Sequence, residues 1–235
     1  MARSFQDLRV LAVDFRGHGS SDWADSYAVD AYVDDVEAVI ERVQLGPVMV
    51  VGHSLGGIVG MWLAARRPHL VERLVVVDIG PELPASAVAQ MLARSDRPTV
   101  FDGPEAAFVA LRAANPFASD DVIRGRVAHG VVESSPGSWT WRHDPLVQVP
   151  RSDALEGLWE IWRASTAPTL VVRGEHSPYV TTELMHRMVT ARPHADGVTI
   201  PGAGHNAHTD QLDAFHSVVG GWLGTGQRED LPPIR

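Results

Sequence analysis

Four short apolar runs, each rich in valine, constrain the fold of this 235-residue chain more than any other feature. They are RVLAVDF (9–15), PVMVVGHS (47–54), RLVVVDIG (73–80) and PTLVVRGE (168–175). Runs that are apolar over most of their length are typical of strands buried on both faces, as in a parallel sheet. Helical patterns separate the first three runs, at residues 28–46 and 55–68. The sequence therefore predicts consecutive β-α-β units and a doubly wound α/β fold.

Residues 81–165 interrupt this alternation. The segment holds PEAAFVALRAANPF, a loop with WTWRHDP, and DALEGLWEIWRAS, and it contains four of the seven tryptophans. We predict that it forms a mostly helical cap over the carboxyl edge of the sheet, where the tryptophans either line a pocket or pack the cap onto the core. The predicted domains are a core at 1–80 and 166–225, the cap at 81–165 and a tail at 226–235.

Composition excludes several classes of function. The chain has no cysteine, so disulfides, thiolate chemistry and cysteine-bound metals are excluded. A net charge of −9 argues against nucleic acid and anionic membrane surfaces as partners. No apolar run reaches the roughly 18 residues of a membrane span, and MARSFQDLRV lacks the apolar region of a signal peptide. These features predict a soluble, cytoplasmic protein whose oligomeric state stays open.

Polar side chains follow the predicted strands. Ser54 follows the second run, Asp78 and Glu175 lie at the ends of the third and fourth, and His205 follows a last strand, GVTI (197–200). In open α/β sheets the functional site lies at the carboxyl ends of the strands. A nucleophilic serine needs a base to take its proton and a carboxylate to orient that base. The order serine, acid, histidine matches that of the nucleophile-elbow hydrolases.

Five segments carry a resemblance to a known family. They are VDFRGHGSSD, VVGHSLGGIVG, RLVVVDIGP, PTLVVRGEHS and IPGAGHNAHTDQ, which lie in this order across residues 9–220. The chain resembles the α/β-hydrolase family, which includes small esterases, lactonases, carbon–carbon bond hydrolases, cofactor-free haloperoxidases and haloalkane dehalogenases. The resemblance implies an α/β-hydrolase fold, with a doubly wound, mostly parallel sheet and an inserted helical cap. It also implies that neither a cofactor nor a metal is needed.

The resemblance also assigns roles to single residues. Ser54 is the expected nucleophile, His205 the expected base, and the Leu55 N–H an expected donor to the oxyanion. Gly52 and Gly56 are expected to keep the strained turn at Ser54 clear of side chains. The alternative for Ser54 is an ordinary helix cap.

The acid departs from the usual family pattern. Many relatives place an aspartate three or four residues after the glycine that ends the fourth strand, where this chain has Ser177 and Pro178. Asp78 ends the third strand, a position that some relatives use, and it is our predicted acid. Glu175 is the alternative, because it directly follows that glycine and has a longer side chain.

Three further histidines lie near these motifs. His208 forms an H-x-x-H pair with His205, but no carboxylate motif accompanies the pair, so no metal site is predicted. We expect His18 to hydrogen-bond backbone in its RGHG loop. The side chain of His53 is expected to point away from that of Ser54.

The start of the chain is a second departure from the family. Relatives begin with three more strands, and the third ends in a His-Gly segment that supplies another oxyanion N–H. This chain opens at what resembles the fourth strand, so it is expected either to be an N-terminally truncated form or to have the strands at 9–15 and 47–54 closed up. Loss of one oxyanion donor costs on the order of 10²–10³ in rate.

The predicted function is a serine hydrolase that cleaves a small carboxylic ester or lactone through an acyl-enzyme. Epoxide hydrolases and dehalogenases need a carboxylate nucleophile, which Ser54 does not provide. Carbon–carbon bond hydrolases and cofactor-free perhydrolases use a similar triad and stay as alternatives. The alternative from another class is a non-catalytic or truncated hydrolase-like binding protein.

Overall fold

The computed structural model of the chain describes residues 8–44, 46–95, 98–148 and 155–224. The predicted tail at 226–235 lies outside the described residues.

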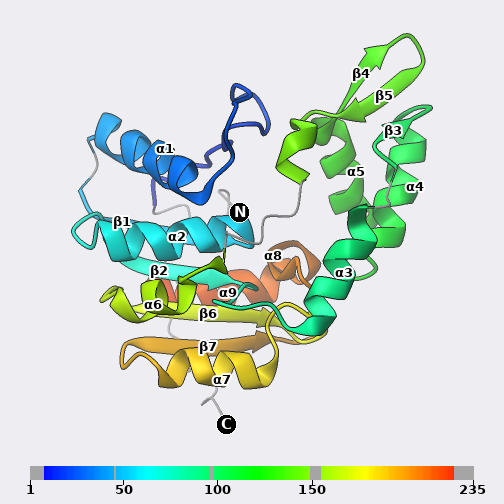
Figure 1. Cartoon of the computed structure of the whole chain (residues 1–235). Coiled ribbons are helices and arrows are strands. Elements are labelled where there is room, and N and C mark those ends of the chain that lie inside the picture. Colours follow the sequence, from blue (N-terminus) through cyan, green and yellow to red (C-terminus); the bar gives the residue numbers. More distant parts are fainter. Residues whose placement is uncertain (1–7, 45, 96–97, 149–154, 225–235) are drawn as a thin grey trace.

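A four-stranded parallel sheet forms the centre of the molecule (Figure 1). Its strands are β1 (Val48–His53), β2 (Val71–Val77), β6 (Thr169–Gly174) and β7 (Ala195–Ile200), and they lie in the order β1-β2-β6-β7. All three neighbouring pairs are parallel. Three of the predicted strand runs and the GVTI strand therefore form this sheet, and the prediction of parallel strands is confirmed.

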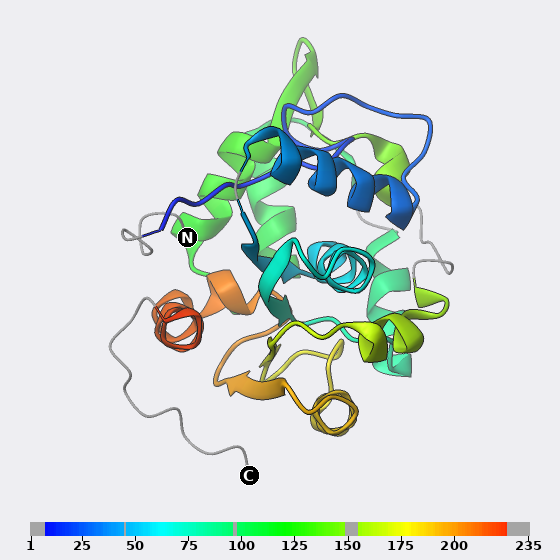
Figure 2. The same ribbon diagram turned by 90° about the vertical axis from the view of Figure 1, so that its left-hand side faces the viewer.

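Helices cover both faces of the sheet. One face carries α2 (Leu55–Arg66), α6 (Leu158–Ala164) and α7 (Thr182–Thr190), whereas α9 (Leu212–Leu223) covers the other face (Figure 2). Strand β2 shows why its second half is apolar, because Leu74 and Val76 face the first layer while Val75 and Val77 face α9. The stretch that is buried on both faces, residues 74–77, leaves no position for a polar side chain until the strand ends.

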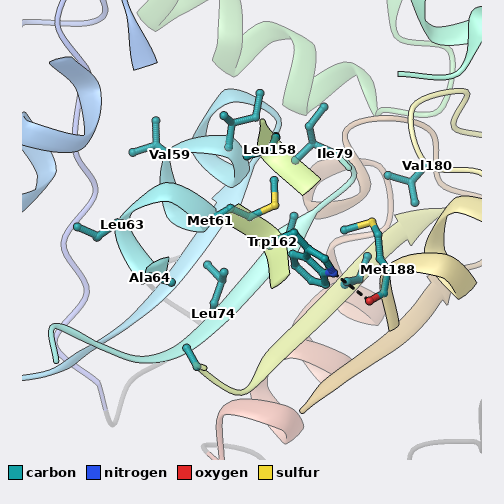
Figure 3. Close-up of a cluster of buried hydrophobic side chains, with 14 of the residues drawn as sticks. Val59, Met61, Leu63, Ala64, Leu74, Ile79, Leu158, Trp162, Val180 and Met188 are labelled. Atoms are coloured by element: carbon teal, nitrogen blue, oxygen red, sulfur yellow. Dashed lines mark hydrogen bonds between the residues drawn. The ribbon is translucent and has the colours of Figure 1, made fainter. Parts of the chain in front are cut away.

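Trp162 lies at the centre of the larger core. The side chain is fully buried among residues of α2, β2 and α7, and its indole N–H donates to the Met188 carbonyl at 2.9 Å (Figure 3). A buried indole N–H needs such a partner. The cap tryptophans were expected either to line a pocket or to pack the cap onto the core, and Trp162 packs into the core.

Residues 9–15 do not form the predicted strand. These residues, all of them described, pair with no neighbouring strand, and Val10, Leu11 and Val13 are about 40% exposed. The prediction was wrong because an apolar pattern shows only that a segment could be a strand, whereas the strand itself also needs a partner for its backbone N–H and C=O groups. Strand β1 is the outer strand of the sheet, so the expectation that 9–15 and β1 close up is also wrong.

The segment between β2 and β6 contains helices and a second sheet. Its elements before α6 are α3 (Ala85–Ser95), β3 (Val100–Phe101), α4 (Pro104–Ala114), α5 (Asp120–Gly130), β4 (Val131–Ser135), β5 (Ser138–Trp141) and the 3₁₀-helix η2 (Pro145–Gln148). Strands β3, β5 and β4 form an antiparallel sheet with its own small apolar cluster. The expectation of a mostly helical segment therefore misses a three-stranded sheet. Figure 1 shows α3, α4 and α5 beyond the carboxyl ends of the main strands.

Several polar contacts join this segment to the rest of the chain. The buried Asp144 accepts a hydrogen bond from Tyr27 Oη at 2.5 Å, and its N–H donates to the Gly17 carbonyl at 2.8 Å. Asn115 accepts from Asn206 Nδ2 at 2.9 Å, next to the predicted base. The loops that carry the candidate site are thus held from the cap side as well as from the sheet.

The remaining described helices are α1 (Val29–Arg42), which packs on α2, and the short α8 (Ala207–Asp210). Over the described ranges, none of the helices combines the length and the apolar character that a membrane span requires.

Candidate active site

Ser54 lies in a strained turn between β1 and α2. Its backbone dihedrals are φ 51° and ψ −116°, close to the first central residue of a type II′ turn, where glycine is usual. The Ser54 N–H donates to the Val77 carbonyl at 3.1 Å, which continues the ladder between β1 and β2. Within the described residues the Ser54 side chain makes no capping hydrogen bond. An ordinary helix cap therefore does not account for this serine.

The space around the turn explains one of the two flanking glycines. A Cβ atom at Gly52 would lie 2.2 Å from the Gly56 carbonyl oxygen, so a side chain there would collide with the start of α2. A Cβ atom at Gly56 would meet no described atom within 4 Å. The expectation that the turn must be free of a side chain is confirmed for Gly52 and wrong for Gly56.

Asp78 and His205 form a direct hydrogen bond. The Asp78 Oδ2 atom lies 2.8 Å from His205 Nδ1, and both side chains are buried. Because a carboxylate only accepts, the proton lies on Nδ1, and Nε2 carries the lone pair that a general base uses. This distance is within the hydrogen-bond reach expected for an acid that orients a base.

Further contacts fix the Asp78 carboxylate. Gly174 N–H donates to Oδ1 at 3.1 Å, and the Ser177 hydroxyl donates to Oδ2. The backbone of Asp78 has φ 53°, and its N–H donates to the Val172 carbonyl at 2.7 Å. A fully buried carboxylate is costly unless it is paired, and Gly174, Ser177 and His205 supply the pairing.

Tyr179 holds the base from another side. Its ring stacks on the His205 ring with a centroid distance of 3.9 Å and an interplanar angle of 22°. Its N–H donates to Ser177 Oγ at 3.1 Å, so one short loop contacts both the candidate acid and the candidate base. Sequence reasoning missed Ser177 and Tyr179 as site residues. The available signal was the position of Ser177, which stands where many relatives place the acid.

Glu175 lies apart from this group. Its side chain is half exposed, and Oε2 accepts from the Gly202 N–H at 2.8 Å. The structure therefore brings Asp78, and not Glu175, to His205.

The remaining predicted residues are placed as follows. Leu55 is the first residue of α2, so its N–H has no acceptor within the helix and lies at the Ser54 turn. His18 Nδ1 lies 3.1 Å from the Arg16 carbonyl oxygen, which confirms the expected contact with backbone. His208 does not contact a cluster of carboxylates, and the described part of the chain holds no group of three or more His, Cys, Asp or Glu that could bind a metal.

His53 contacts the candidate base directly. Its Nε2 atom lies 2.8 Å from the His205 carbonyl oxygen, and the two rings are 4.6 Å apart. The His53 ring also lies 4.6 Å from the ring of His208. Burial, together with the neighbouring histidines, holds the pKa of His53 well below its usual value. Burial likewise lowers the pKa of His208 to about 4.

A parallel sheet that presents a strained serine, a buried aspartate and a histidine at its carboxyl edge defines a hydrolase of the α/β class. Comparison with known families agrees, because residues 2–218 match the model of the "Alpha/beta hydrolase family". The chain therefore belongs to the alpha/beta hydrolase family.

Individual relatives cover most of the chain. An sn-1-specific diacylglycerol lipase from Mus musculus is 30% identical over 220 residues, which are 92% of this chain and 71% of that protein. An esterase from Mycobacterium tuberculosis is 34% identical over 232 residues, and the match covers 92% of this chain and 74% of the esterase. The crystal structure of E-2-(acetamidomethylene)succinate hydrolase matches with a TM-score of 0.83 at 27% identity, covering 91% of this chain and 80% of that one.

Proposed function

We propose that this chain is a serine hydrolase that cleaves a small carboxylic ester, with Ser54 as nucleophile, His205 as base and Asp78 as acid. The observation that carries the proposal is the 2.8 Å contact between Asp78 Oδ2 and His205 Nδ1. It fixes the tautomer in which His205 Nε2 can accept a proton. The esterase and the lipase among the relatives support an ester as the substrate class.

The proposed reaction proceeds in two halves. His205 Nε2 takes the Ser54 hydroxyl proton while Oγ bonds to the ester carbonyl carbon, and the carbonyl oxygen becomes an oxyanion that the Leu55 N–H stabilises. The bond to the leaving oxygen then breaks as His205 returns the proton to the alcohol. In the second half His205 deprotonates a water molecule that attacks the acyl-enzyme. The acid leaves, and the Ser54 hydroxyl is restored.

Asp78 stays ionised throughout this cycle. It holds the imidazole in one orientation and stabilises the imidazolium that forms in each half. The donors from Gly174 and Ser177 keep the carboxylate in place while the charge on His205 changes.

The substrate within this class is open to experiment. One relative with a matching structure is named for hydrolysis of E-2-(acetamidomethylene)succinate, and others are named as esterases and lipases. Lactones, carbon–carbon bonds of vinylogous diketones and perhydrolysis use the same triad and are the alternative substrates and reactions. A non-catalytic binding protein is the alternative from another class.

Covalent labelling tests the proposal. A fluorophosphonate probe should add once to the wild-type protein, and peptide mapping should place the adduct on Ser54. Ser54→Ala should lose both the label and turnover of short-chain p-nitrophenyl esters, lactones and vinylogous diketones. Ser134→Ala is the matched control, because that serine lies in the exposed β4–β5 hairpin, where its hydroxyl donates to the carbonyl of the nearby Ser138 at 3.1 Å. A label on another serine, or turnover that survives in Ser54→Ala, would refute the proposal.

A further inference from the structure

The order of the strands sets a problem for the candidate base. Ser54 follows β1, whereas His205 follows β7, and β2 and β6 lie between these two outer strands. The loop that carries His205 must therefore reach across the carboxyl edge of the sheet and be held there. Asp78, at the end of β2, holds the ring at one atom. Tyr179 also stacks on this ring, but neither contact fixes the backbone of His205.

His53 contacts the backbone of the same residue. It is the last residue of β1, directly before Ser54, and its Nε2 lies 2.8 Å from the His205 carbonyl oxygen. A carbonyl oxygen only accepts, so His53 carries its proton on Nε2 and acts as the donor. The backbone of the candidate base is thus bonded to the neighbour of the candidate nucleophile.

The surroundings of His53 keep this donor uncharged. The titratable and charged groups around the ring are His205, His208 and Arg126, and burial is the largest cause of its lowered pKa. A neutral ring can lie 4.6 Å from His205 without opposing the positive charge that His205 gains when it takes a proton.

We propose that His53 is a positioning residue for catalysis, which bonds the His205 backbone through Nε2–H and so fixes the base relative to Ser54. The inference rests on the proposed function of this site and adds a residue to it. It assigns His53 no contact with substrate. Its effect is on the geometry of proton transfer, and it should therefore appear in kcat more than in KM.

Three variants separate this role from simple packing. His53→Phe keeps a ring of similar size and removes the donor, while His53→Gln supplies an amide N–H at nearly the position of Nε2. His208→Phe is the matched control, because it changes another partly buried histidine of the same cluster, and no hydrogen bond joins His208 to His205 among the described residues. Thermal melting establishes that each variant is folded, and His53→Met replaces His53→Phe if the latter does not fold.

The expected kinetic result is a selective loss. His53→Phe should lower kcat for a short-chain ester roughly 10–100-fold with little change in KM, since a misplacement of about 1 Å costs up to about 100-fold. His53→Gln should recover most of this loss, and His208→Phe should stay close to wild type. Equal losses in His53→Phe and His208→Phe, no recovery in His53→Gln, or wild-type kcat in a folded His53→Phe would each overturn the inference.

A measurement without substrate keeps the inference separate from the proposed function. Nitrogen NMR of labelled histidine follows the Nδ1 proton that His205 shares with Asp78. In His53→Phe this proton should exchange faster with water, whereas in His208→Phe it should exchange as in wild type. If the wild-type protein neither reacts with the phosphonate nor turns over an ester, the proposed function fails, while the exchange rates still decide the role of His53. Unchanged exchange in His53→Phe would overturn that role.

Discussion

The substitution Asp78→Asn tests whether Asp78 is the acid that orients His205, and it changes the shape of the side chain very little. The carboxylate accepts from Gly174 N–H on one oxygen, and from His205 Nδ1 and the Ser177 hydroxyl on the other. An asparagine amide offers only one accepting oxygen, and its other end donates. The substitution therefore cannot satisfy Gly174 and His205 together.

Both orientations of the amide damage the site. If the oxygen faces Gly174, the NH₂ group faces His205 Nδ1, and the ring must move its proton to Nε2, which then cannot take a proton from Ser54. If the oxygen faces His205, the NH₂ group meets the Gly174 N–H across the 3.1 Å that Oδ1 spans now. Two donors facing each other in a buried site cost about 1–3 kcal/mol of stability. We expect kcat to fall by roughly 10⁴, as in the best-studied serine triad.

Steady-state hydrolysis of p-nitrophenyl acetate measures this effect, with circular dichroism to show that the variant is folded. Glu175→Gln is the control, because Glu175 is half exposed and its contact with Gly202 N–H survives in an amide. We expect its kcat to stay within about twofold of wild type, as for most surface substitutions. A folded Asp78→Asn with kcat within tenfold of wild type, or a larger loss in Glu175→Gln, would refute the assignment of the acid.

Three further outcomes follow from the same contacts. Ser177→Ala removes one donor to Asp78 and should lower kcat by about tenfold, the equivalent of one hydrogen bond, as steady-state kinetics would show. Gly52→Ala would place a Cβ atom 2.2 Å from the Gly56 carbonyl, so overpacking should lower the free energy of unfolding in urea by about 1–3 kcal/mol. His208 has a pKa of about 4 in the folded chain against 6.5 when unfolded, so the unfolded state binds more protons between these values. Stability should therefore fall by up to about 3 kcal/mol as the pH drops from 6.5 to 4, and His208→Phe should flatten that fall in urea unfolding at several pH values.

Much of the fold could be predicted because its signals are local. The valine-rich runs of β2 and β6 are buried on both faces and that of β1 is partly buried on both, so their patterns have few alternatives. Residues 9–15 show the same pattern and form no strand, since strand formation depends on a partner that a local pattern cannot reveal. The small antiparallel sheet was missed for a related reason, because β3 has only two residues.

Some residues of the candidate site could likewise be predicted from the sequence, and others could not. Ser54, Asp78 and His205 each follow a recognisable strand, so the sequence selected them as candidates, although it left Glu175 as an alternative acid. Ser177 and His53 act through contacts with residues far away in the sequence, Asp78 and His205, which no spacing pattern encodes. A serine in a loop and a histidine in a strand are common, and only the folded arrangement distinguishes these two.

The strain at Ser54 yields a last test, which concerns stability. Its dihedrals, φ 51° and ψ −116°, suit glycine, and a side chain in such a conformation costs about 1–3 kcal/mol. Ser54→Ala and Ser54→Gly both remove the hydroxyl, but only glycine also relieves the strain. Glycine also makes the unfolded chain more flexible than alanine does, which lowers the free energy of unfolding by about 0.4–1 kcal/mol and offsets part of the gain. We therefore expect Ser54→Gly to unfold in urea with a free energy about 1 kcal/mol above that of Ser54→Ala, and neither variant to react with the phosphonate. Equal stability, or a more stable Ser54→Ala, would mean that the turn relaxes without the hydroxyl and that the strain belongs to the serine side chain rather than to the backbone path between β1 and α2.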